Sequence, residues 1–311
     1  MPASLTRSLR LWFDSHATPP AEAAAPGARR FDLLRLVPFV ALHLACLGAF
    51  FTGWSPFALA VAALLYAVRM VAITGFYHRY FSHKAFRTSR AMQFAFAVLG
   101  ASAAQRGPLW WAAHHRHHHA HADGPADAHS PHRHGFLWAH LGWFASREHF
   151  ATRLERVPDL ARYPELRFLD RFDILVPALL GLALYGAGEA CAAWWPALGT
   201  DGLQLFTWGF AISTVALWHA TFTVNSLAHS FGSRRYATRD RSRNNLWLAL
   251  LTFGEGWHNN HHHFPGAARQ GFYWWEIDLT YYALRALAAL GIVQDLRPVP
   301  AAVRDARREN A

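Results

Sequence analysis

The chain has few charged residues and few cysteines for its length. Of its 311 residues, 16% are charged, 53% are hydrophobic and two are cysteines. Charged residues make up about a quarter of an average soluble domain, so this deficit argues against an ordinary soluble protein. Cys46 and Cys191 lie far apart in apolar runs, which excludes a disulfide framework and a cysteine-based metal site. We interpret both as small hydrophobic residues.

Lysine is almost absent, and the basic residues are arginines. Lys84 is the single lysine, and the net charge is +10. A basic excess of this size is found in nucleic-acid-binding proteins, at anionic membrane surfaces and in the inner loops of membrane proteins. The apolar runs favour a membrane protein, and we expect no nucleic-acid partner.

Four long apolar runs are candidates for membrane spans, because a helix crosses the hydrocarbon core with about 20 residues. We expect spans at about residues 36–54, 57–76, 174–195 and 203–224. The connections within the first pair and within the second pair are short, so the spans form two helical hairpins. The apolar segment 92–104 is too short to span, and we expect it in the interface or packed on the domain.

The arginines lie on one side of these spans. The two short loops inside the hairpins contain no arginine or lysine, so the positive-inside rule predicts a multi-pass protein with both termini and the central region in the cytoplasm. Residues 1–30 are expected to form a flexible cytoplasmic tail, because no short apolar run follows their early positive charges as it would in a signal peptide. Residues 31–295 are expected to form one integral membrane domain, and residues 296–311 a charged tail.

Histidine is abundant, with 21 residues, and a density of this kind indicates metal binding. Three clusters of histidines follow the spans, and a further histidine comes four residues after Asn225. The candidate ligands are His78, His83, His115, His118, His119, His229, His258, His261 and His262. We interpret His43 and His219, within spans, as packed or hydrogen-bonded residues.

The spacing of the third cluster, H-x-x-H-H, places its histidines on one helical face, so we expect three imidazoles to converge on one point. The second cluster repeats this spacing. Nine histidines are more than one four-coordinate ion uses, which favours two metal ions. A single His-rich tract often binds stray metal without function, but three spaced clusters on one membrane side favour a built site.

The pattern H-x4-H, H-R-x-H-H and H-x-x-H-H, with two spans between the second and third boxes, resembles the membrane fatty-acyl desaturases of the stearoyl-CoA desaturase type. The similarity covers about residues 66–265 and extends to the surroundings of the boxes, including Gly135-Phe136, His140-Leu-Gly-Trp143 and Asn225-Ser-Leu-Ala-His229. The resemblance implies an all-α membrane protein whose four transmembrane helices, in two hairpins, are capped by a cytosolic helical domain that carries a di-iron site.

The resemblance also implies the site and the reaction. The nine histidines would bind two Fe ions, with Asn225 holding a water on one of them. O2 and two electrons would convert a saturated long-chain acyl group to a cis-alkene, most simply at Δ9, with release of two waters. Gln105, Trp111 and Thr221 match the residues that line the kinked acyl tunnel of that family.

Chemistry supports iron independently, because zinc has no accessible second oxidation state for O2 activation. Asp123, Asp127 and Glu255 lie near the boxes, and we expect them to orient the imidazole rings. The sequence contains no haem-binding or iron–sulfur motif, so we expect electrons from an acidic ferredoxin or cytochrome b5-like protein attracted by the basic face. The expected location is a bacterial inner membrane.

One departure from the family leaves the acyl carrier open. Ala113-His114 stands where the animal enzymes carry Arg-Asp, whose arginine contacts coenzyme A, so that contact is missing here. Arg147, Arg153 or Arg156 would be a replacement, and a glycerolipid or a carrier protein is the alternative substrate form. A fatty-acid hydroxylase with the same metal site is the nearest alternative function, and a zinc hydrolase or metal transporter is a more distant one.

Overall fold

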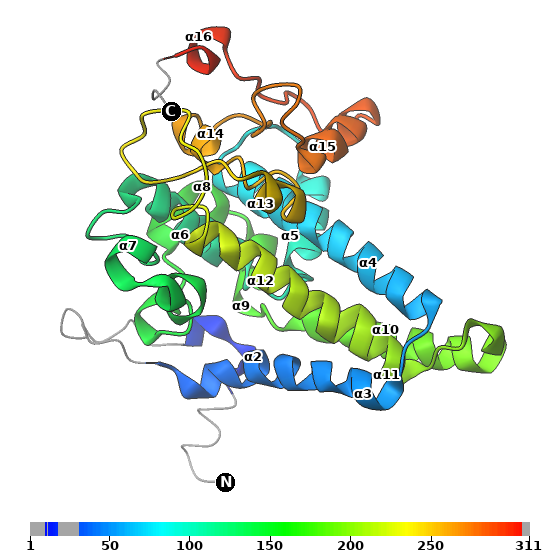
Figure 1. Cartoon of the computed structure of the whole chain (residues 1–311). Coiled ribbons are helices and arrows are strands. Elements are labelled where there is room, and N and C mark those ends of the chain that lie inside the picture. The colour runs from blue at the N-terminus through cyan, green and yellow to red at the C-terminus, as the bar shows by residue number, and fades with distance from the viewer. Residues whose placement is uncertain (1–9, 11, 18–30, 307–311) are drawn as a thin grey trace.

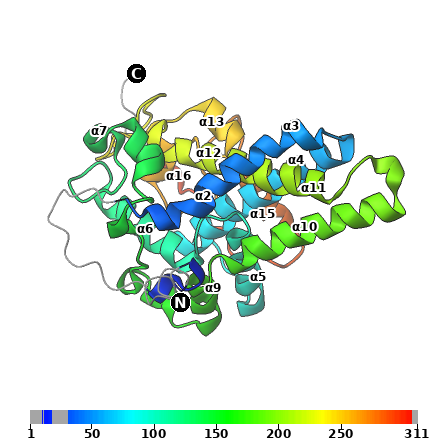
Figure 2. The same cartoon turned by 90° about the horizontal axis from the view of Figure 1, so that it is seen from below.

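The computed structural model describes residues 10, 12–17 and 31–306, and its regular elements are helices. Four long helices extend together to one side, and the shorter helices and loops gather at their other end (Figure 1). The view from below shows the same arrangement (Figure 2). The predicted all-α membrane fold with four long apolar helices is confirmed.

The four membrane-spanning helices are each built from consecutive helical segments or from one long helix. They are Leu33–Thr52, comprising α2 (Leu33–Ala45), η2 (Cys46–Gly48) and α3 (Ala49–Thr52); Pro56–Ser82, comprising α4 (Pro56–Val71) and the π-helical η3 (Ala72–Ser82); α10 (Leu175–Trp194); and Gly202–Ser226, comprising α11 (Gly202–Leu205), the π-helical η8 (Phe206–Ile212) and α12 (Ser213–Ser226).

The second helix ends at Ser82 rather than near residue 76, where its apolar run stops. Arg79 interrupts the apolar pattern, yet its side chain is buried because carboxylates of Glu255 and Asp278 lie 3.1 and 3.0 Å from its guanidinium. A buried charge is tolerated when it is paired in this way. The paired arginine therefore lets the helix continue and carry His78 into the interior.

The two hairpin loops, which lack arginine and lysine, meet at the far end of the bundle. Ser55 begins α4 as an N-cap, accepting a hydrogen bond from the backbone N–H of Ala58, and Pro56 occupies the first helical position. These are strong helix-start signals. The Ser55 hydroxyl also forms a hydrogen bond with the hydroxyl of Thr200 in the second hairpin, so the hairpins are joined there.

The shorter helices form a cap at the other end of the bundle. Between the second and third spans lie α5 (Arg90–Ala101), α6 (Pro108–His121), α7 (Pro131–His134), η4 (Trp138–Gly142), η5 (Arg147–His149), η6 (Leu154–Arg156), α8 (Pro158–Ala161) and α9 (Pro164–Arg171). After the fourth span lie α13 (Leu246–Leu251), α14 (His258–His263), α15 (Leu279–Ala289) and α16 (Ala301–Arg304). Both α5 and α6 pack against η3, so the main hydrophobic core joins the second span to the cap.

A chain of three histidines links the spans to the cap. The Nε2 atoms of His43 and His219 lie 3.0 Å apart, and His219 Nδ1 lies 3.1 Å from His140 Nε2. His140 Nδ1 lies 3.0 Å from the Ser226 hydroxyl. The interpretation of His43 and His219 as hydrogen-bonded residues is therefore confirmed.

Most of the predicted N-terminal tail, residues 1–30, lies outside the described residues. The short 3-10 turn η1 (Ser15–Ala17) is described, and it contacts the end of α9: the Ser15 hydroxyl donates to Asp173 over 2.9 Å, and His16 Nε2 lies 2.9 Å from Asp170. At the other end of the chain, the Arg304 carbonyl accepts a hydrogen bond from the Tyr236 hydroxyl, 2.7 Å away.

Candidate metal centre

The nine candidate histidines lie in two adjacent groups. In each group, the candidate ligand atoms all lie within 4.8 Å of one another. The five-histidine cluster contains His78, His83, His115, His119 and His261, and the four-histidine cluster contains His118, His229, His258 and His262. The fold thus brings together every histidine that the sequence singled out.

The expectation that each H-x-x-H-H box converges on one point was wrong. On α6, His115 and His119 join the five-histidine cluster while His118 joins the other; on α14, His258 and His262 share a cluster while His261 crosses to the first. Residues i and i+4 lie almost above each other on a helix, whereas i+3 is rotated about 100° from i+4. The two clusters therefore lie between α6 and α14, and each helix contributes to both.

The distances between rings fit two metal ions. In the five-histidine cluster, His78 Nε2 lies 3.0 Å and His119 Nε2 2.9 Å from His261 Nε2. In the four-histidine cluster, the Nε2 atoms of His229 and His258 lie 3.0 Å apart. Nitrogens that bind one ion at about 2 Å are separated by roughly 3 to 4 Å, so each cluster can hold one ion.

The protonation of these rings also suits a metal site. Among the described residues, His262 Nε2 is buried and has no hydrogen-bond partner. Burial lowers the pKa of His262 to about 4, and it lowers the pKa values of His115 and His258 well below that of free imidazole. These rings are therefore neutral near pH 7, which is the form that binds metals.

The three carboxylates expected to orient imidazoles do contact candidate ligands. Asp123 accepts a hydrogen bond from His229 Nδ1 over 2.9 Å, and Asp127 from His118 Nδ1 over 3.1 Å. Glu255 forms the corresponding contact with His78 Nδ1. These hydrogen bonds fix each ring so that its Nε2 atom points into a cluster.

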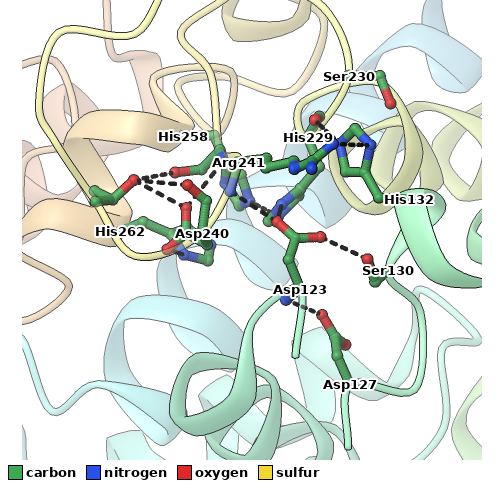
Figure 3. Close-up of polar contacts among 12 residues, drawn as sticks. Asp123, Asp127, Ser130, His132, His229, Ser230, Asp240, Arg241, His258 and His262 are labelled. Carbon is green, nitrogen blue, oxygen red and sulfur yellow. Dashed lines mark hydrogen bonds and ion pairs between the residues drawn. The ribbon is translucent and has the colours of Figure 1, made fainter. Parts of the chain in front are cut away.

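Asp240 is a fourth carboxylate of this kind, which sequence reasoning missed. It accepts a hydrogen bond from His262 Nδ1 over 2.9 Å, next to Asp123 and His229 (Figure 3). Burial alone would raise the pKa of Asp240, but the hydrogen bonds from His262 and Ser242 lower it below its usual range. Asp240 lies in an arginine-rich segment away from the boxes, so only a search for every acid after the fourth span would have found it.

A glycine makes room for the contact between Glu255 and His78. Gly254 has φ +128°, and a Cβ atom there would lie 2.4 Å from the Asp278 carboxylate and 3.0 Å from the Arg79 guanidinium. Both the backbone conformation and the crowding require glycine. The turn can thereby bring Glu255 against Arg79 and His78 together.

A cavity of about 500 Å³ reaches the clusters, and most of its wall is apolar. All four other predicted site residues line it: Gln105, Trp111, Thr221 and Asn225. Gln105 Nε2 donates to the Thr221 hydroxyl over 2.9 Å, and the Trp111 ring stacks on His115. An apolar cavity with a few polar groups, open to a metal centre, can bind a hydrocarbon chain beside the metals.

We expect Asp240→Asn to weaken metal binding at the four-histidine cluster by about 10- to 100-fold, the usual effect of changing a carboxylate that orients a ligand histidine. The substitution keeps the shape but removes the charge that holds His262 Nδ1. Competition with a calibrated chelator would measure the affinity. Asp295→Asn is the control, because Asp295 pairs with Arg87 at the surface; equal affinities in both variants would contradict the role of Asp240.

Comparison with known proteins agrees with this geometry. Residues 52–294 match the model of the fatty acid desaturase family. The chain is 36% identical to Delta-9 acyl-lipid desaturase 1 of Arabidopsis thaliana over 272 residues, covering 86% of this chain and 84% of the relative. It is 37% identical to sn-2 palmitoyl-lipid 9-desaturase of Nostoc sp., covering 86% of this chain and 90% of the relative. It is 35% identical to icosanoyl-CoA 5-desaturase of Limnanthes douglasii, covering 86% of this chain and 72% of the relative.

The family match spans most of the chain and includes all three histidine boxes. The four long apolar helices and the paired histidine clusters are the features expected of a multi-pass membrane enzyme with a di-metal site. The chain therefore belongs to the membrane fatty acid desaturase family and is an O2-dependent oxidoreductase.

Proposed function

We propose that this protein introduces a cis double bond at Δ9 of a saturated long-chain acyl group, using two iron ions held by the nine histidines. The observation that carries the proposal is that residues of both histidine clusters line one largely apolar cavity. The site requires O2 and two electrons for each double bond, and it releases two waters.

The residues of the chain have separable roles in this proposal. The iron ions, when bound, supply the O2 chemistry that removes hydrogen from an unactivated methylene. The apolar wall binds the acyl chain and excludes water, and the carboxylates of Asp123, Asp127 and Asp240 hold ring orientations. Asn225, which lines the cavity one turn before His229, would hold a water beside the four-histidine cluster.

The tunnel residues support a fixed path of the acyl chain, which a single double-bond position such as Δ9 requires. In the cavity wall, Gln105 donates a hydrogen bond to Thr221, and the Trp111 ring stacks on His115 of the five-histidine cluster. These contacts give the acyl chain a defined path beside the metals. The similar proteins are named as 9-desaturases and as a 5-desaturase, so the double-bond position is the feature to measure.

We propose a lipid-linked acyl chain as the natural substrate. The two arginines that line the cavity are already paired within the chain: Arg106 lies 2.6 Å from Asp173, and Arg35 lies 3.6 Å from Asp32. Coenzyme A carries several phosphate charges, and neutralised arginines offer them little attraction. A faster rate with stearoyl-CoA than with a stearoyl glycerolipid, both in nanodiscs, would contradict this choice.

The topology proposed here follows the arginine distribution. Residues 31–295 form the desaturase domain between the tails 1–30 and 296–311, and the metal clusters face the cytoplasm of a bacterial inner membrane. Labelling of introduced cysteines by a membrane-impermeant reagent in inverted vesicles would test the orientation.

Product analysis tests the function directly. Total fatty acids from a host that expresses the protein would be analysed by gas chromatography with mass spectrometry, after chemical tagging of double bonds. We expect new Δ9 monoenes. Hydroxylated chains would instead assign the protein to the hydroxylases, and unchanged lipids from an iron-loaded enzyme supplied with a donor would contradict the proposal.

The proposed electron donor is an acidic ferredoxin or a cytochrome b5-like protein. Arg133, Arg239 and Arg241 are exposed at the surface above the four-histidine cluster. The backbone N–H of Arg241 donates to Asp123, which in turn accepts from His229 (Figure 3). Two consecutive hydrogen bonds therefore connect this basic surface to the candidate metal ligand His229.

We expect donor-driven turnover to fall about tenfold when the salt concentration rises from about 0.05 to 0.5 M, because salt screens attraction between opposite charges. Turnover would be measured with ferredoxin, its reductase and NADPH. Turnover supported by dithionite, which needs no docked protein, serves as the control and should change little. A donor-driven rate that does not change with salt would contradict electrostatic docking at this surface.

A further inference from the structure

Apart from the candidate ligand His258, three cavity-wall residues have a buried ring nitrogen without a hydrogen-bond partner. These nitrogens are His114 Nε2, His129 Nδ1 and Trp143 Nε1, and the absence of partners refers to residues 10, 12–17 and 31–306. The three residues are 6%, 6% and 7% exposed. Buried polar groups in proteins are nearly always hydrogen-bonded, so a set of three beside one cavity points to a ligand.

These side chains form one group, although they come from three segments. The Trp143 ring lies edge-on to both imidazoles, with centroid distances of 5.6 Å to His114 and 4.9 Å to His129. None of the three belongs to the five-histidine or the four-histidine cluster, although the candidate ligand atom of His129 lies within 4.8 Å of those of His118 and Asp127. His129 Nδ1 is 3.6 Å from Asp127, beyond hydrogen-bond distance, and that carboxylate already binds His118.

The chemistry of the group defines what it binds. An indole N–H only donates a hydrogen bond, and an imidazole nitrogen donates when it carries the proton. The ligand must therefore present an acceptor, most simply an oxygen. Along a saturated acyl chain, oxygen occurs only at the carboxyl linkage.

We propose that His114, His129 and Trp143 bind the carbonyl oxygen of the acyl linkage, an inference that rests on the proposed function. The group lies close to the metal site: His114 precedes His115 in α6, and the His129 ring lies 4.3 Å from that of His118 between centroids. A carbonyl held there fixes how many carbons separate the linkage from the metals. The group thereby helps to set the double-bond position.

The test compares two ligands that differ only in the carbonyl, stearoyl lysophosphatidylcholine and its octadecyl ether analogue. Binding to the iron-loaded enzyme in detergent would be measured without O2 or reductant, by displacement of a fluorescent fatty-acyl lipid. We expect the wild type to bind the ester about tenfold more tightly than the ether, the upper range for one or two hydrogen bonds. In His114→Leu and in Trp143→Phe this preference should disappear, with ether binding retained.

The control is His121→Leu, a change at an exposed histidine at the end of the same helix, which should keep the ester preference. Size-exclusion chromatography and iron content would show that each variant is folded. A wild type without ester preference, or a preference that persists in both cavity variants, would overturn the assignment. Because binding is measured without turnover, failure of the desaturation assay alone would be recognised as failure of the proposed function.

Discussion

His262→Ala is expected to abolish desaturation and to reduce the bound iron from two ions to one per chain. His262 contributes to the four-histidine cluster, and its Nδ1 atom is held by Asp240. Removing the ring leaves three imidazoles there, while the five-histidine cluster keeps all of its own. Iron analysis of the purified protein and fatty-acid analysis of the expressing host would measure the two effects.

The neighbouring residue provides a matched control. His263 stacks on Tyr236, and its Nε2 atom lies 3.0 Å from the Val303 carbonyl, away from both clusters. We expect His263→Ala to retain both irons and most of the activity. Equal losses in the two variants would indicate a general defect in folding, and full activity of His262→Ala would refute its assignment as a ligand.

Thr221→Trp is expected to prevent a stearoyl chain from reaching its productive position, with at least a tenfold loss of Δ9 product from this substrate. The side chain of Thr221 lines the cavity and accepts a hydrogen bond from Gln105. An indole at this position would occupy part of a cavity of about 500 Å³ and break that bond, and overpacking of a filled site is unfavourable. Gas chromatography of products from chains of several lengths would show the loss and any shift to shorter substrates.

Thr223→Trp on the same helix is the comparison, because Thr223 is not among the residues that line the cavity. It should leave the product pattern unchanged. Formation of the Δ9 product by Thr221→Trp at the wild-type rate would show that the acyl chain follows another path.

Much of the fold follows from local patterns in the sequence. The four apolar runs, which are paired across short Ser-Pro and Gly-containing breaks, specify four membrane helices because length and hydrophobicity decide insertion. The position where the second helix ends could not be predicted from its apolar run. Its extension through Arg79 depends on Glu255 and Asp278, which lie about 180 and 200 residues further along the chain, so no local pattern contains that information.

The same division applies to the site. The H-x4-H, H-R-x-H-H and H-x-x-H-H boxes identify the candidate ligands because helical spacing places imidazoles on neighbouring surfaces. Their sorting into a cluster of five and a cluster of four depends on how α6 and α14 face each other. Asp240 became part of the site because the chain after the fourth span returns across the four-histidine cluster.

The sequence by itself thus determined a helical membrane protein and its candidate metal ligands, since apolar length and histidine spacing are local properties. Only the tertiary structure decided which histidines lie in the same cluster, which carboxylates contact them, and that Gln105 meets Thr221 in the wall of a cavity beside them. These are contacts between residues far apart in the chain, and packing of the whole domain brings them together.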